Sequence, residues 1–175
     1  MIDARFRPLD RWIGEKTPTN RRKRATFRAK YQGTLDLLEH ELQKLSARDI
    51  VIEAEFATSE IRNDGWPRGR ATPKGPAVIL SFTKRSGSQQ IPVAMPCDTF
   101  DDWEDNLRGI ALSLEALRAV DRYGVTRSGE QYAGFAQISA PAASDNMTVD
   151  IASHVLASFV DGAESMHSRL VNAEV

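Results

Sequence analysis

Apolar residues between positions 100 and 123 recur at alternating steps of four and three residues. This spacing places them on one face of an α-helix, the face through which a helix packs on a sheet. The residues of this stripe are Trp103, Leu107, Ile110, Leu114 and Leu117. Thr99 and Asp102 have the spacing of a capping box at the start of this helix, and Gly124 is placed to end it. The pattern predicts a helix over residues 100–123 that lies across a sheet.

A second stripe with helical spacing lies earlier in the chain, over residues 25–45. Strands are predicted where apolar residues alternate with polar ones or form short apolar runs. Such segments lie at residues 48–57, 77–84 and 89–95, with a further short run at 60–62. Pro92 has no backbone N–H, so we expect the strand that contains it at the edge of the sheet. These elements predict an α+β domain over residues 25–140, with an antiparallel sheet of three to five strands and the helices packed on one face.

The last part of the chain, residues 145–175, shows another helical stripe followed by a polar tail. A short linker rich in Ala and Pro precedes it. This predicted C-terminal helix either packs on the domain or offers its apolar face to a partner or a second copy.

The composition of the 175-residue chain is that of a globular protein, with 41% hydrophobic and 27% charged residues. No apolar run reaches the roughly 20 residues that a membrane helix needs. The first residues lack the apolar core of a signal peptide. The single cysteine, Cys97, excludes an intramolecular disulfide and fits a reducing compartment. We therefore expect a cytoplasmic protein.

Charge is distributed unevenly along the chain, although the net charge is only −1. Residues 1–30 contain ten Lys or Arg residues against three acidic ones, so the remainder of the chain is acidic. We interpret residues 1–24 as a basic extended arm. Such an arm binds phosphates, binds an acidic protein, or folds back on its own acidic body. The residues expected to contact nucleic acid are Arg21, Arg22, Lys23, Arg24 and Arg28.

Acidic residues gather near the start of the predicted 100–123 helix. They are Asp98, Asp101, Asp102 and Asp105. Carboxylates are the ligands that Mg²⁺ prefers, but solvated acids also collect at helix N-termini because the helix dipole favours them. Neither a phosphate-binding glycine loop nor a zinc spacing of His and Cys accompanies them. We expect no metal and no cofactor.

The segment that follows this helix, residues 121–135, is dense in Arg, Tyr, Gly and Glu. Arg and Tyr are enriched at binding hot spots, which predicts a partner-binding surface. Its residues are Arg122, Tyr123, Arg127, Glu130 and Tyr132. Alternatively, the tyrosines pack on the sheet while an arginine pairs with the glutamate to close the loop. No acid or base partner accompanies the glutamate, so the segment does not indicate catalysis.

Several stretches of the chain carry a family resemblance. They read PLDRWIGEKTPTNRRKRATFRAKYQGTLDLLEHEL, IRNDGWPRGRA, CDTFDDWEDNLRGIALSLEALRAVDRYGV and RSGEQYAGF. These stretches resemble the N-terminal domain of J-domain-containing (DnaJ-type) proteins of actinobacteria and their phages. The likeness covers about residues 6–160. In that family a J-domain with a His-Pro-Asp tripeptide commonly follows and engages an Hsp70 ATPase.

This chain has no His-Pro-Asp tripeptide, because its histidines are followed by Glu, Val and Ser. The resemblance therefore implies fold and lineage, without stimulation of Hsp70. We expect a non-enzymatic protein-interaction module, phage-encoded or phage-derived, that acts on a host or phage protein. The alternative is a nucleic-acid-binding accessory protein that uses the basic arm.

Overall fold

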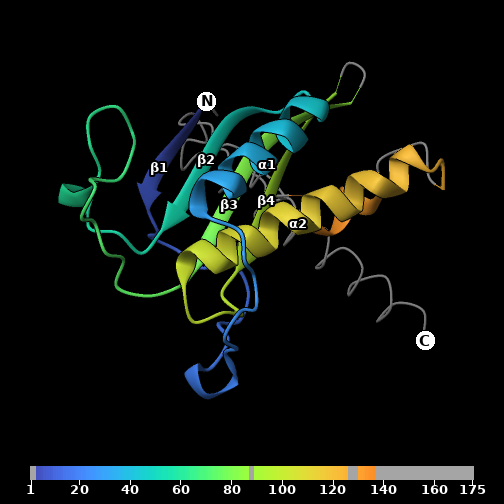
Figure 1. The fold of residues 1–175 in the computed structure, drawn as a ribbon. Coiled ribbons are helices and arrows are strands. Elements are labelled where there is room, and N and C mark those ends of the chain that lie inside the picture. Colours follow the sequence, from blue (N-terminus) through green and yellow to red (C-terminus); the bar gives the residue numbers. More distant parts are fainter. Residues whose placement is uncertain (1–2, 87–88, 126–129, 137–175) are drawn as a thin grey trace, which may run out of the picture. The chain divides into compact units, whose positions relative to one another are not determined.

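The computed structural model describes residues 3–86, 89–125 and 130–136. In this part of the chain a four-stranded sheet has two α-helices packed against one face, which is an α+β fold (Figure 1). The strands are β1 (Ala4–Pro8), β2 (Arg48–Ala54), β3 (Val78–Ser86) and β4 (Gln89–Cys97). The helices are α1 (Tyr31–Lys44) and α2 (Trp103–Arg122), with short 3-10 helices η1 (Thr19–Arg21), η2 (Thr58–Glu60) and η3 (Glu130–Phe135). The predicted C-terminal helix within residues 145–175 lies outside the described residues.

The sheet has the order β1-β2-β3-β4 and is mixed, so the prediction of a wholly antiparallel sheet is wrong. Strands β2, β3 and β4 pair antiparallel, whereas β1 pairs parallel with β2 and places Phe6 opposite Ile52. Parallel neighbours need a crossover connection, and α1 lies in the one between β1 and β2. The sequence pattern misses β1 because this strand has only two buried apolar side chains, Ala4 and Phe6. The basic arm therefore begins after Pro8.

Both edges of the sheet carry features that limit further pairing. The strand with Pro92 lies at an edge, as predicted, and on its outer side a bridge joins Val93 to Ala136. At the other edge, the Phe6 N–H donates to the Gly65 carbonyl at 2.7 Å. Gly65 has a φ of +82°, a conformation that glycine adopts without strain. The loop around Gly65 thus covers β1, while the predicted run at residues 60–62 contributes only a bridge from Ile61.

The core lies between the sheet and the two helices (Figure 1). The predicted stripe of α2 faces it: Leu107, Ile110 and Leu114 are buried, and the ends of the stripe are half-buried. At one of those ends, the Trp103 ring meets the ring of Phe56 with the centroids 5.2 Å apart. The apolar stripe predicted across the sheet is confirmed.

The helix boundaries differ from the predicted ones at their N-terminal ends. Helix α1 begins at Tyr31, because residues 25–30 continue the extended arm. Helix α2 begins after Asp102, whose side chain accepts from the Glu104 N–H at 2.8 Å, so the predicted cap at Thr99 is wrong. At its other end the Gly124 N–H donates to the Asp121 carbonyl, as expected for a terminating glycine. In the described ranges, no helix is long and apolar enough to cross a membrane.

Candidate functional site

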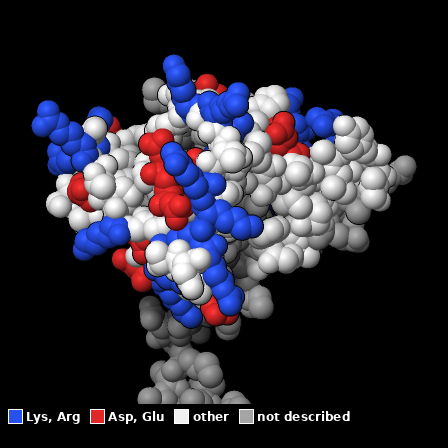
Figure 2. Space-filling view, turned by 60° about the horizontal axis from the view of Figure 1, so that its bottom comes forward, with Lys and Arg blue, Asp and Glu red and all other residues white. Residues whose placement is uncertain are grey.

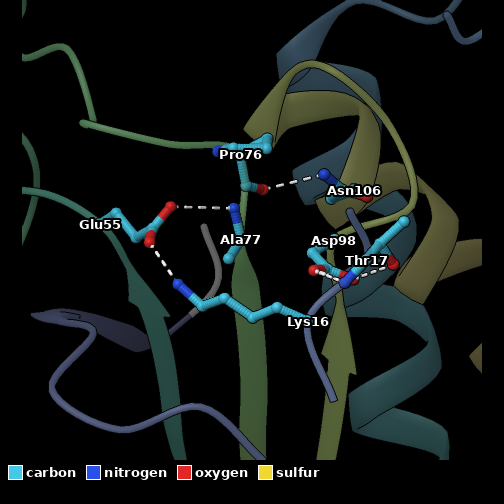
Figure 3. Close-up of polar contacts among 7 residues, drawn as sticks. All are labelled: Lys16, Thr17, Glu55, Pro76, Ala77, Asp98 and Asn106. Carbon is cyan, nitrogen blue, oxygen red and sulfur yellow. Dashed lines mark hydrogen bonds and ion pairs between the residues drawn. The ribbon is translucent and has the colours of Figure 1, made fainter. Parts of the chain in front are cut away.

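The basic arm runs past the end of the sheet at which β2 and β4 finish, and hydrogen bonds hold it there. Asp98 follows directly after β4 and is 4% exposed. Its two carboxylate oxygens accept from the backbone N–H and the hydroxyl of Thr17, each at 2.7 Å (Figure 3). Hydrogen bonds to an ionised carboxylate are stronger than neutral ones. Asp98 therefore anchors the arm, and the prediction that it belongs to a solvated helix start is wrong.

The neighbouring residue of the arm reaches a second carboxylate. Lys16 Nζ lies 2.8 Å from Glu55 Oε1, just beyond β2. The other oxygen of Glu55 accepts from the Ala77 N–H at 3.4 Å, at the start of β3 (Figure 3). The lysine side chain is 49% exposed, so solvent screens this ion pair. It contributes less to holding the arm than the buried Asp98 does.

Asn106 of α2 organises the loop on which the arm rests, and its side chain is fully buried. Its amide nitrogen donates to the carbonyls of Pro76, Phe100 and Asp102 at 2.8, 3.0 and 3.1 Å. Its amide oxygen accepts from the Phe100 N–H at 2.9 Å and from Cys97 Sγ at 3.2 Å. A buried amide with all these partners fixes the connection between β4 and α2. Figure 3 shows this amide beside the Asp98 anchor.

The arm then follows the connection between β4 and α2. The Lys23 N–H donates to the Thr99 carbonyl at 2.9 Å, and the Asp101 N–H donates to the Lys23 carbonyl at 3.2 Å. Further on, the rings of Phe27 and Phe100 pack edge to face with centroids 5.1 Å apart. The backbone of the arm therefore folds back on the body, which is one of the three interpretations of its charge.

The predicted nucleic-acid-binding side chains remain available on this fixed backbone. Arg21, Lys23, Arg24 and Arg28 are exposed. None of these four forms an ion pair with any residue in the described ranges. Arg22 differs, because it is half-buried and its Nε is enclosed without a partner among those residues. Figure 2 shows basic side chains gathered in a ridge across this face, with acidic side chains beside it.

The structure separates the residues predicted for partner binding after α2. Arg122 and Tyr123 stand on the surface, and Tyr123 is 75% exposed. The guanidinium carbon of Arg122 lies 5.1 Å from the centroid of the Tyr123 ring. Val125, which the sequence pattern did not single out, is 76% exposed beside them in the chain. Arg127 lies outside the described residues.

Two further residues of that predicted surface lie in η3, the short helix that closes the segment. Glu130 is its first residue, and its side chain is not among those described. Tyr132 is 2% exposed and belongs to the core, with Lys84 Nζ 4.1 Å from its ring centroid. Burial and the charge of Asp121 raise the pKa of Tyr132 to about 12. The prediction that Tyr132 contacts a partner is wrong, because the apolar area of its ring is already used in packing.

An ion pair between the two helices was not predicted. Glu41 of α1 is buried in the apolar stripe of that helix, and Arg118 of α2 donates to both of its carboxylate oxygens. The hydrogen bond and charge of Arg118 hold the pKa of Glu41 below its usual value, and the same contacts raise the pKa of Arg118. The signal in the sequence was Glu41 itself, an acid between Leu38 and Leu42 on the buried face.

Comparisons with protein-family models, with curated proteins and with solved structures found no match for this chain. The resemblance to the N-terminal domain of DnaJ-type proteins therefore stays a prediction. Among the residues predicted as binding sites, those that the structure leaves exposed form two surfaces of different character. One is the basic ridge of the arm, and the other is the exposed end of α2.

Proposed function

We propose that this protein is a non-enzymatic interaction module that binds a host or phage protein through the exposed end of α2. The observation that carries the proposal is the exposure of Arg122, Tyr123 and Val125 next to one another in the chain. The resemblance described above suggests the source of the partner. The residue types of this surface suggest a contact with another protein.

Arg and Tyr are the residue types that contribute most to protein–protein binding, because they combine apolar area with directional hydrogen bonds. Here the guanidinium of Arg122 lies over the ring of Tyr123, so the two side chains present charge and aromatic area together. The helix behind them is held by the buried side chains of Leu107, Ile110 and Leu114. A contact residue on a rigid element binds with less ordering cost than one on a free loop.

The test is affinity capture from a lysate of the native host, followed by mass spectrometry. The wild type should enrich a partner that the double variant Arg122→Ala with Tyr123→Ala loses. The matched control is Arg11→Ala with Ile13→Ala, which also removes an exposed Arg and an exposed apolar side chain. Enrichment of the same partner by all three proteins would contradict the proposal. Melting temperatures should agree closely, because exposed substitutions change stability by only about 0.5 kcal/mol.

A second candidate function is nucleic-acid binding by the basic ridge, as an accessory protein. It is favoured by the four exposed basic side chains without ion pairs among the described residues, on a backbone held by Asp98 and Thr99. Basic groups that neutralise phosphates release counterions, so affinity of this kind falls steeply with salt. Because hydrogen bonds already hold the backbone of the arm, only the side chains need to be ordered when the polyanion binds.

This candidate is tested with fluorescein-labelled single- and double-stranded DNA and RNA in a salt titration. Replacing the four exposed residues Arg21, Lys23, Arg24 and Arg28 by serine should reduce the slope of log affinity against log salt by about three for single strands. The control replaces Lys44, Arg48, Arg70 and Lys74, four exposed basic residues outside the arm, by serine. No binding of any labelled strand by the wild type at low salt would eliminate this candidate.

A further inference from the structure

An open groove of about 360 Å³ is bordered by the arm, the end of β4, the middle of α2 and η3. Its lining is mainly apolar and includes three half-buried phenylalanines, Phe27, Phe100 and Phe135. Phe135 packs against the hydrophobic core of the described residues, whereas Phe27 and Phe100 are not part of that core. Two large rings that do not serve the core, on the wall of an open groove, indicate a surface for a ligand.

The pair of rings that belongs to this groove alone is held in place before any ligand binds. The rings of Phe27 and Phe100 pack edge to face with centroids 5.1 Å apart. A Cβ at Gly109 of α2 would lie 3.2 Å from the edge of the Phe100 ring, so the glycine gives this ring room against the helix. The Phe100 backbone is fixed as well, because its N–H donates to the Asn106 amide oxygen at 2.9 Å. The pair therefore needs little ordering when a ligand stacks on it.

Positive charge borders the groove on the side of the arm. Phe27 lies in the extended end of the arm, between the exposed residues Arg24 and Arg28. Within the described ranges, neither arginine is engaged in an ion pair. Successive side chains of an extended chain point to opposite sides. The ring of Phe27 therefore faces the body, while the neighbouring guanidinium of Arg28 stays in solvent.

The acidic residues of the connection between β4 and α2 do not cancel this charge. Asp98 is buried and both of its oxygens accept from Thr17. Asp101 and Asp102 are exposed, and Asp102 already accepts from the Glu104 N–H. Against these two exposed acids stand the four exposed basic side chains of the ridge. Positive charge is in excess beside the groove, which favours an anionic ligand.

An aromatic groove beside excess positive charge matches the two chemical parts of a nucleotide. The flat face of a base stacks on an aromatic ring, and the phosphate meets basic side chains. The lining reads little of the base edge, since the hydroxyl of Ser113 already donates to the Gly109 carbonyl at 2.8 Å. In a duplex the bases stack on one another and are not free to enter a groove. The complementarity therefore favours a single strand.

We propose that the groove accepts an unpaired base of a single-stranded nucleic acid whose phosphates lie along the basic ridge. The base stacks on the ring of Phe27, which Phe100 supports, with little preference for sequence. The inference rests on the second candidate function, nucleic-acid binding by the ridge, and adds to it the kind of strand that is bound. It does not depend on the exposed end of α2.

The test compares two fluorescein-labelled strands of equal charge, an oligothymidylate of about eight nucleotides and an abasic strand of the same length. The full chain should bind the oligothymidylate about tenfold more tightly, because only this strand offers a base for stacking. In NMR spectra of the ¹⁵N-labelled protein, the oligothymidylate should shift the amides of Phe100 and Gly109. The abasic strand and a DNA duplex should leave these two amides unchanged.

Three variants separate stacking on the ring from apolar contact and from the path of the arm. Phe27→Leu keeps an apolar side chain but removes the aromatic face. The affinities for the two strands should then agree within about twofold, with the affinity for the abasic strand unchanged. Phe27→Trp should retain the preference of the wild type. The control Ile13→Ala removes an exposed apolar side chain of the same arm, outside the groove, and should leave both affinities unchanged.

The outcomes distinguish failure of the groove from failure of the ridge. Equal affinity of the wild type for the two strands would overturn the proposal and leave the ridge as a phosphate-binding surface. No binding of either strand at low salt would eliminate both. An undiminished preference in Phe27→Leu would place the stacked base elsewhere and overturn the proposal. Shifts at Phe100 and Gly109 caused by a neutral peptide containing phenylalanine, but by neither strand, would identify a protein side chain as the occupant and contradict it.

Discussion

Helix α2 and the basic arm both adjoin the connection between β4 and α2, but different interactions hold them in place. The helix is positioned by apolar side chains, of which Leu107 and Leu114 are fully buried. The arm, residues 9–30, is positioned mainly by hydrogen bonds from its backbone and from Thr17 to groups at the end of the sheet. Apolar burial uses the side chains of an element for packing. Backbone hydrogen bonds leave the side chains free, which is why the arm has a fixed path and still exposes its charges.

The largest effect is expected when a buried apolar side chain of α2 is removed. Leu114→Ala should lower the free energy of unfolding by roughly 2–5 kcal/mol, because it removes buried methyl groups and leaves a cavity. Urea denaturation measures this change, and Glu115→Ala, at an exposed neighbour on the same helix, serves as the control. An unchanged denaturation midpoint for Leu114→Ala would show that apolar burial does not position α2.

A smaller effect tests whether a polar contact also positions α2. Glu41→Gln should lower the free energy of unfolding by about 1–2 kcal/mol at neutral pH, since Arg118 loses its charged partner. The pKa of Glu41 is lowered in the folded protein, so its contribution is present above the unfolded pKa, about 4.3. That contribution is lost as the pH falls through the lower, folded pKa.

The measurement is the free energy of unfolding of the wild type and of each variant, from neutral to acidic pH. The difference between the wild type and Glu41→Gln should shrink toward zero as the pH falls below about 4. For the exposed control Glu115→Gln the difference should stay near zero at every pH. A difference for Glu41→Gln that persists in acid would mean that the substitution disturbs packing and that the ion pair is not responsible.

The smallest effect concerns the arm alone. Thr17→Val removes one of the two hydrogen bonds to Asp98 and should lower the free energy of unfolding by about 1 kcal/mol. Its clearer result is local: trypsin should cleave faster after Arg21, Arg22, Lys23 or Arg24, because the arm opens without global unfolding. Thr19→Val, at an exposed position of the same arm, is the control. Equal cleavage rates for the two variants would show that the bond from the Thr17 hydroxyl to Asp98 does not hold the arm.

Regular spacing of apolar residues was enough to predict both helices, three of the strands and the face of α2 that is buried. Such a pattern repeats over many residues, so a local departure does not erase it. The α+β class and the edge position of the strand with Pro92 follow from the same local signals. Composition also named Arg122 and Tyr123 as candidate surface residues, although it left open that the tyrosine packs on the sheet.

Only the tertiary structure assigned the remaining features, because each depends on residues far apart in the chain. The parallel pairing of β1, the anchoring of Thr17 by Asp98 and the pairing of Glu41 with Arg118 join positions separated by about 46, 81 and 77 residues. Tyr132 has the same local sequence whether it faces a partner or the core, and the packing of η3 buried it. Local sequence determines which elements form, whereas the contacts between elements determine which of their side chains remain free to bind.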